Sequence, residues 1–91
     1  MNRESAGFLV HGRVQGVGFR WWTTRQAREL GLAGTVRNRP DGAVEVFVSG
    51  PAAAVQRFRE RLEEGPRTAV VRSVEPLDPP PDLPSEFTIV R

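Results

Sequence analysis

The spacing of the apolar residues changes several times along this chain, and the order of these spacings restricts the fold more than any other feature. Around Phe8 the side chains follow the two-residue alternation that is typical of a β-strand. From Phe19 to Leu30 the apolar residues recur at helical spacing. Both patterns return in the second half of the chain, so the sequence predicts a mixed α+β domain.

Turn-forming residues mark where the predicted elements begin and end. Gly31 is placed to end the first helix, and the Pro40–Gly42 turn is typical of a β-hairpin. Pro51 is placed to begin the second helix, because a first helical residue needs no amide hydrogen. The predicted strands run from about Ala6 to Arg13, Ala33 to Arg39, Ala43 to Ser49, Val70 to Pro76 and Phe87 to Val90; the predicted helices cover Phe19 to Leu30 and Pro51 to the residues before Gly65.

The order strand, helix, strand, strand, helix, strand is that of the ferredoxin-like fold, here with a short additional strand at the C-terminus. We therefore predict an α+β sandwich in which two helices cover one face of an antiparallel sheet. A length of 91 residues leaves room for one domain, 1–91. The proline-rich segment 78–84 is expected to be a stiff loop. This fold has many functions, so it settles none of them.

The composition excludes several kinds of chemistry. The chain has no cysteine, so it has no disulfide, thiolate metal site or cysteine nucleophile, and its one histidine, His11, leaves no His-rich metal site. All thirteen basic residues are arginines, and eleven acidic residues balance them to a net charge of +2. The isoelectric point of about 10.9 reflects the absence of lysine and tyrosine. We therefore expect neither a metal, a cofactor nor a nucleic-acid partner.

No apolar stretch approaches the roughly 20 residues that a membrane span requires. The N-terminal sequence MNRESAGF has no apolar signal core. These features predict a cytoplasmic protein with no membrane partner, and we expect it to be a monomer.

The segment GRVQGVGFR, from Gly12 to Arg20, lies between a predicted strand and a predicted helix. Gly16 and Gly18 free the backbone for tight turns, and the helix that follows presents unpaired amides and its positive dipole end to the loop. With the guanidinium of Arg20, these features can form an anion cradle. The spacing matches neither GxGxxG nor a Walker loop. Spacing alone slightly favours the simpler interpretation, a glycine-rich turn beside a surface arginine.

Asn38 is the second candidate, near the end of a predicted strand. It shares a strand face with Val36, on the side expected to face the core, where a polar group normally needs a partner. Spacing alone favours a turn-forming residue before the Pro-Asp-Gly turn. Arg37 and Arg39 are expected to point away from Asn38 as solvated charges. Trp22 is expected in the core and Trp21 near the rim of the loop.

GRVQGVGFR followed by ARELGLAGTVRNRPDGAVEVFVSGP strongly resembles the acylphosphatase family. The resemblance is highly specific from Phe8 to Pro51 and continues more weakly to the closing FTIV. Thr35 departs from it, because many members carry an aromatic residue there. The resemblance implies the fold predicted above and hydrolysis of an acyl phosphate to a carboxylate and inorganic phosphate, which would also act as an inhibitor.

The resemblance also implies a role for each matching residue. Arg20 would bind the phosphate, and Asn38 would orient the attacking water. The backbone amides of the loop would complete the phosphate cradle. They belong to Gln15, Gly16, Val17, Gly18 and Phe19.

Three alternatives remain open at this point. A sensor with the same fold could bind an anion without catalysis. An RNA-recognition domain would need stacking aromatics on its first and third strands, where this chain offers only Phe8 and Phe47. The substrate could also be carbamoyl phosphate, because related domains occur in hydrogenase-maturation proteins.

Overall fold

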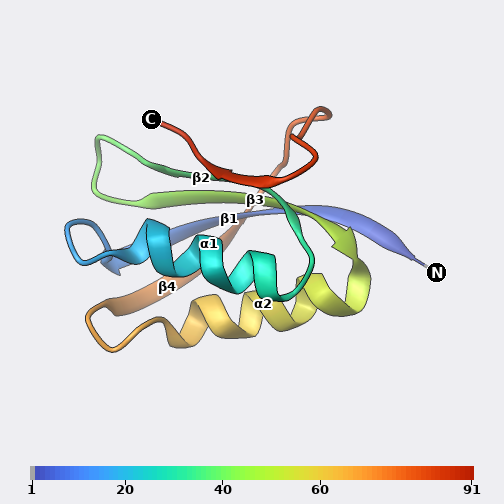
Figure 1. Cartoon of the computed structure of the whole chain (residues 1–91). Helices are drawn as coiled ribbons and strands as arrows, with labels where there is room; N and C mark the ends of the chain where they lie inside the picture. Colours follow the sequence, from blue (N-terminus) through green and yellow to red (C-terminus); the bar gives the residue numbers. More distant parts are fainter. Residues whose placement is uncertain (1) are drawn as a thin grey trace.

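The computed structural model describes residues 2–91, and its elements follow the predicted order (Figure 1). They are β1 (Arg3–Arg13), α1 (Phe19–Glu29), β2 (Ala33–Asn38), β3 (Val44–Pro51), α2 (Ala52–Glu64), β4 (Val70–Leu77) and β5 (Phe87–Ile89). Both helices lie on the same face of the sheet, which is the ferredoxin-like arrangement. No helix within residues 2–91 is long and apolar enough to cross a membrane.

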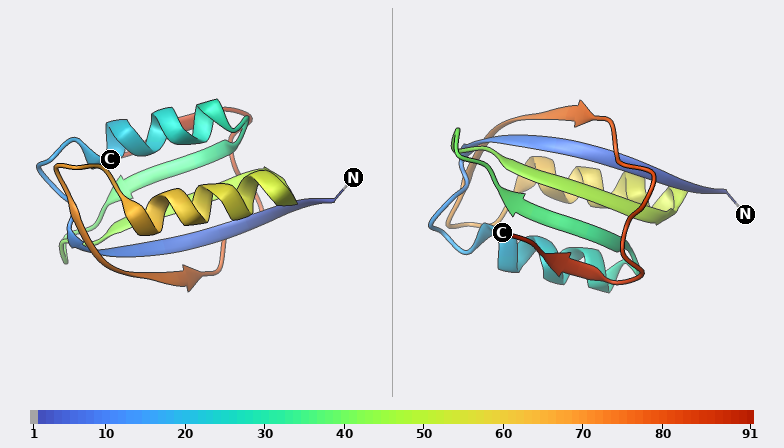
Figure 2. Two further views of the ribbon diagram at one scale, coloured as in Figure 1. Left: turned by 90° about the horizontal axis from the view of Figure 1, so that it is seen from below. Right: turned by 90° about the horizontal axis from the view of Figure 1, so that it is seen from above.

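The five strands are ordered β4-β1-β3-β2-β5 across the sheet. The first four pair antiparallel, as predicted, but β5 pairs parallel with β2 and places Phe87 opposite Gly34. The prediction of a wholly antiparallel sheet is therefore wrong at this edge. The reason is the proline-rich connection, which carries the chain from the β4 edge to the β2 edge on the side away from the helices (Figure 2). The last strand consequently enters in the direction of β2.

Residues alternate between the two faces of β3 as its spacing predicts, and every second residue is buried. The buried valines of β3 face the helices, where they meet Phe58 and Leu62 of α2 and Phe19 of α1. The rings of Phe8 and Phe58 lie 6.1 Å apart between centroids, and Phe87 joins the same cluster at 6.4 Å from Phe58. Burial of this apolar surface against the sheet is the main favourable contribution to folding.

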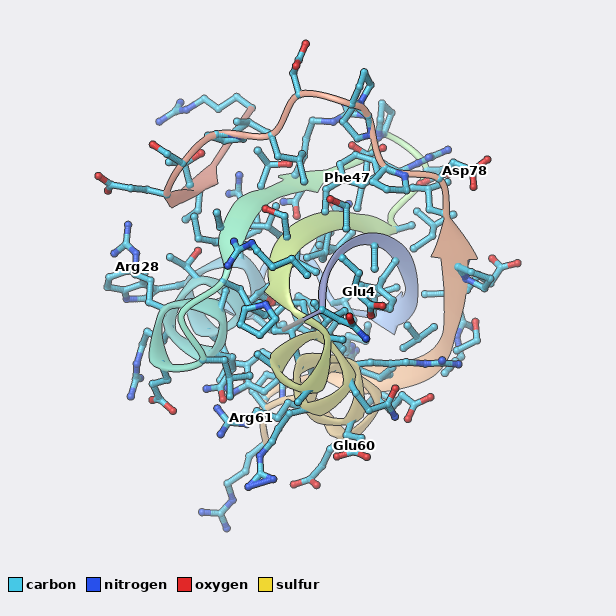
Figure 3. All side chains as sticks on the ribbon, turned by 90° about the vertical axis from the view of Figure 1, so that its right-hand side faces the viewer. Glu4, Arg28, Phe47, Glu60, Arg61 and Asp78 are labelled. Carbon is cyan, nitrogen blue, oxygen red and sulfur yellow. The ribbon has the colours of Figure 1, made fainter. Side chains whose placement is uncertain are left out.

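Phe8 and Phe47 lie on different faces of the sheet. Phe8 is only 6% exposed and packs in the helix-facing core, whereas Phe47 lies on the opposite face (Figure 3). Within residues 2–91, the open face therefore lacks the pair of stacking aromatics that an RNA-recognition sheet presents. On β1, the partly exposed side chain of His11 contacts Glu75 of the neighbouring strand β4.

The predictions for β1 and β3 are each too short by more than one residue at one end. Pro51 does not begin the second helix: it pairs with Arg3 at the end of β3 and precedes α2 with an extended backbone (ψ 138°). The first strand begins at Arg3 rather than at Ala6, because β3 offers partners along this whole length. Pairing between distant strands has extended both elements beyond their local patterns.

Candidate active site

The loop between β1 and α1 is shaped by two glycines. Gly16 and Gly18 have φ angles of 75° and 76°, in the left-handed region that favours glycine over all other residues. Gly18 directly precedes α1 and offers no side chain to cap its amides. The first backbone N–H groups of the helix are therefore available to a ligand at the positive end of the helix dipole.

This loop, the start of α1 and the end of β2 surround a hollow of about 190 Å³, which we call the loop hollow. It brings together Arg20 and Asn38, which lie on different elements and were singled out independently in the sequence. Its lining residues are Val14, Gly16, Gly18, Phe19, Arg20, Trp21, Asn38 and Ile89.

Asn38 ends β2 on the same strand face as Val36, which is fully buried. Its side-chain oxygen Oδ1 is buried and has no hydrogen-bond partner among residues 2–91. A buried oxygen without a donor costs about 1–3 kcal/mol. Such a cost is expected where a group must bind a ligand or a water molecule, so Oδ1 is a candidate acceptor for a donor entering the loop hollow.

Among residues 2–91, Arg20 is the only arginine that lines the loop hollow. It is partly buried at the second position of α1 and has no ion-pair partner within residues 2–91. Its guanidinium is permanently charged and carries donors in a planar fork that matches the oxygens of a phosphate group. The side chain is thus an uncompensated cation beside a set of helix amides.

The neighbouring arginines are used differently. Arg37 and Arg39 lie 3.2 Å and 3.7 Å from carboxylate oxygens of Glu45, and Arg39 also pairs with Asp41. The hydrogen bond from Arg37 to Glu45 raises the pKa of the Arg37 guanidinium. The two arginines, expected as solvated charges, are thus partly exposed but also paired with Glu45 on the adjacent strand. Neither lines the loop hollow.

The side chain of Gln15 anchors the loop instead of facing the hollow. Its amide nitrogen Nε2 donates to the carbonyl oxygens of Arg39 at 2.8 Å and Ala43 at 2.9 Å, at the β2–β3 turn. The turn is itself braced by Asp41, whose pKa is lowered by the hydrogen bond from the amide of Ala43 and by the charge of Arg39. Gln15 thereby ties the loop to the turn that follows Asn38.

A second anchor comes from the connection between α2 and β4. The hydroxyl of Thr68 donates to the carbonyl oxygen of Val17 at 3.0 Å. Of the predicted cradle residues, Gly16, Gly18, Phe19 and Arg20 line the loop hollow, whereas Gln15 and Val17 do not. No sequence pattern pointed to Thr68, because its partner is 51 residues away.

We expect Gln15→Met to weaken both the fold and the site. Methionine keeps the length and the packing of the side chain but removes both donors, and each lost hydrogen bond is worth about 1 kcal/mol. Urea denaturation should therefore show a loss of about 2 kcal/mol in the free energy of unfolding. Phosphate should also bind more weakly, as measured by titration calorimetry. Unchanged stability and phosphate affinity in Gln15→Met would rule out the anchoring role.

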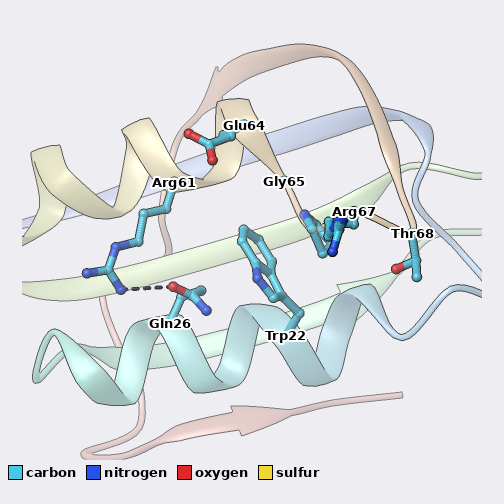
Figure 4. A pocket seen from close by; sticks show the side chains of 8 residues that line it. Trp22, Gln26, Arg61, Glu64, Gly65, Arg67 and Thr68 are labelled. Atoms are coloured by element: carbon cyan, nitrogen blue, oxygen red, sulfur yellow. Dashed lines mark hydrogen bonds between the residues drawn. The ribbon is translucent and has the colours of Figure 1, made fainter.

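A larger hollow of about 650 Å³ lies between the two helices (Figure 4). It is lined by Trp22, Gln26 and Arg61 among others, and shares no residue with the loop hollow. The guanidinium of Arg61 already donates to Gln26 at 2.8 Å and pairs with Glu29 at 3.1 Å. Arg67 also lines this hollow and has no ion-pair partner within residues 2–91, but the hollow lies at the C-terminal end of α2 and so lacks the helix amides that accompany Arg20.

The fold and the loop hollow together define a class: a ferredoxin-like α+β domain whose glycine loop, helix N-terminus and arginine are suited to an anion. The acylphosphatase family model matches residues 6–89. A curated acylphosphatase from Halorhodospira halophila is 48% identical over 96% of this chain and 95% of its own length. One from Koribacter versatilis is 51% identical over 87% of this chain and 72% of its own length.

Comparison with solved structures indicates the same family. The structure of an acylphosphatase from Coxiella burnetii superposes with a TM-score of 0.90 at 34% identity, covering 98% of this chain and 94% of that one. The chain belongs to the acylphosphatase family, and it is a hydrolase of that type. The resemblance noted in the sequence is confirmed, as is the ferredoxin-like fold it implied.

Proposed function

We propose that this enzyme hydrolyses acyl phosphates by attack of water on phosphorus, with the phosphoryl group held by the Gln15–Arg20 loop and the water oriented by Asn38. One observation carries this assignment. The unpaired guanidinium of Arg20 and the unpartnered Oδ1 of Asn38 line the same hollow, at the amide-rich start of α1. A cation and amide donors suit the phosphoryl oxygens, whereas a free acceptor suits a water hydrogen.

The hydrolysis requires few catalytic groups from the side chains. The oxygen of the attacking water forms a bond to phosphorus while the bond between phosphorus and the acyl oxygen breaks. The leaving carboxylate has a pKa near about 4, so it departs without a general acid. One proton of the water passes to a phosphoryl oxygen, which gives a carboxylate and dihydrogen phosphate. Because the transition state is loose, the water needs positioning more than deprotonation.

The loop and Arg20 stabilise the charge on the phosphoryl oxygens. Donors that are already oriented before reaction need no reorganisation as the transition state forms, and this effect is often the largest in such catalysis. Gln15 and Thr68 contribute by holding the loop from both sides. No step in this scheme calls on a metal, so we propose that the enzyme acts without one.

We propose that the enzyme acts as a monomer. We also propose that the protein works in the cytoplasm on a small-molecule substrate, without a nucleic-acid or membrane partner. The even mixture of acids and arginines supports the exclusion of nucleic acid.

Hydrolysis of benzoyl phosphate by the purified protein tests the mechanism directly. We expect equal rates in EDTA and in magnesium buffer, with inorganic phosphate inhibiting competitively. Loss of activity in EDTA that magnesium restores would contradict the metal-free mechanism. Inhibition by phosphate that does not compete with substrate would contradict the assignment of the loop hollow as the phosphoryl site.

A further inference from the structure

The mouth of the loop hollow carries exposed apolar side chains. Trp21 is 61% exposed and Ile89 is 42% exposed, and both line the hollow together with Arg20 and Asn38. Within residues 2–91 only one other large hydrophobic side chain, Val70, is comparably exposed, and it does not line this hollow. Two of the three exposed large hydrophobic side chains within residues 2–91 therefore lie beside the candidate phosphoryl site.

Their positions follow from the two elements that meet there. Trp21 directly follows Arg20 in the first turn of α1, so it belongs to the same structural unit as the anion-binding groups. Ile89 ends β5, which runs parallel to β2 and pairs Ile89 with Val36, two residues before Asn38. The parallel pairing thus brings an apolar side chain to the end of the sheet where Asn38 lies.

Trp21 is not needed by the core. Its neighbour Trp22 packs against Phe19 with 5.5 Å between ring centroids and lies against the core cluster. No aromatic pair within residues 2–91 includes Trp21. A large indole ring that is exposed and unstacked at the mouth of a polar hollow is available to a ligand.

The size of the hollow decides which part of a ligand reaches this rim. A volume of about 190 Å³ is below the usual range for a site that encloses a whole organic ligand. With the phosphoryl group at Arg20 and the loop amides, an acyl group larger than acetyl has to extend to the mouth. There it meets the apolar surfaces of Trp21 and Ile89.

From these observations we infer that Trp21 and Ile89 form an acyl-binding rim that makes the enzyme selective for apolar, and above all aromatic, acyl phosphates. This inference rests on the proposed function, because the rim has this role only if the phosphoryl group binds in the loop hollow. An aromatic acyl group would stack on the indole ring and remove apolar surface from water. An acetyl group is too small to gain as much from either side chain.

The test compares kcat/KM for benzoyl phosphate and for acetyl phosphate in the parent and in Trp21→Ala. We expect the benzoyl-to-acetyl ratio to fall about five-fold in the variant, mainly through a higher KM for benzoyl phosphate, because the contact is made equally in the ground and transition states. Trp21→Phe should restore most of the ratio. Ile89→Ala should lower it by a smaller factor, and Val70→Ala serves as the matched control because it removes an exposed apolar group outside the hollow.

The outcomes separate this inference from the proposed function. If the parent hydrolyses both substrates and Trp21→Ala keeps the parental ratio, the acyl-binding rim is wrong while the proposed function stands. If Trp21→Ala loses both activities by the same factor, Trp21 supports the phosphate cradle and does not select the acyl group. That result would also contradict the acyl-binding rim. If the folded parent hydrolyses neither substrate, the proposed function and the inference fail together.

Discussion

Replacing Arg20 with alanine should lower kcat/KM for benzoyl phosphate by about 10²- to 10³-fold, the range expected when one preorganised donor to a developing anion is removed. Arg20 is the only arginine in the loop hollow and has no competing carboxylate among the described residues, so no neighbour can replace it. Inhibition by inorganic phosphate should be lost in the same variant. Steady-state kinetics and calorimetric titration with phosphate measure the two effects.

Two further variants separate the guanidinium from simple positive charge. Arg20→Lys keeps the charge but loses the planar fork of donors, so it should retain phosphate binding at reduced affinity and recover only part of the rate. Arg25→Ala removes an exposed arginine of the same helix outside the hollow and should behave like the parent. Unchanged inhibition by phosphate in Arg20→Ala would show that the cradle is assigned to the wrong residue.

Replacing Asn38 with alanine should separate binding from turnover. We expect kcat to fall by about 10²-fold, because a water molecule that is poorly placed rarely reaches the attacking geometry. The affinity for inorganic phosphate should stay close to that of the parent, since Arg20 and the loop amides remain. Kinetics with benzoyl phosphate and phosphate inhibition, measured on the same preparation, give both quantities.

Stability offers an independent check on Asn38. Its Oδ1 is buried without a partner, so removing it eliminates an unfavourable burial rather than a hydrogen bond. The free energy of unfolding of Asn38→Ala should therefore equal or exceed that of the parent while turnover collapses. Thr35→Ala, on the same strand but outside the hollow, is the control for a general effect on β2. Near-normal turnover in Asn38→Ala would exclude the water-orienting role.

The site was only partly predictable from the sequence. Arg20, the two loop glycines and Asn38 could be singled out because each belongs to a local pattern: a loop before a helix, or a polar residue on the buried face of a strand. Spacing alone nevertheless favoured ordinary turns at both places, and it was the resemblance to acylphosphatases that combined them. The structure places them in one hollow, because β2 and the start of α1 meet at the same end of the sheet.

The anchoring of the loop could not be predicted in this way. The acceptors of Gln15 are carbonyl oxygens 24 and 28 residues farther along the chain, and Thr68 reaches a carbonyl 51 residues before it. Every residue has a backbone carbonyl, so the residue types in the sequence do not show which carbonyl will accept a hydrogen bond. Likewise, the pairing of Arg37 and Arg39 with Glu45 depends on the register between β2 and β3.

By itself, the sequence determined the order of the elements, the face that each buries and the glycine-rich loop, because periodicity, turn chemistry and backbone freedom are local properties. Tertiary structure alone decided the parallel entry of β5, the extension of β3 through Pro51, the two anchors of the loop and the position of Ile89 beside Trp21. These features depend on which distant segments pair and in which register. That choice is set by burying one common core while satisfying the backbone hydrogen bonds of all strands together, and no short stretch of sequence specifies it.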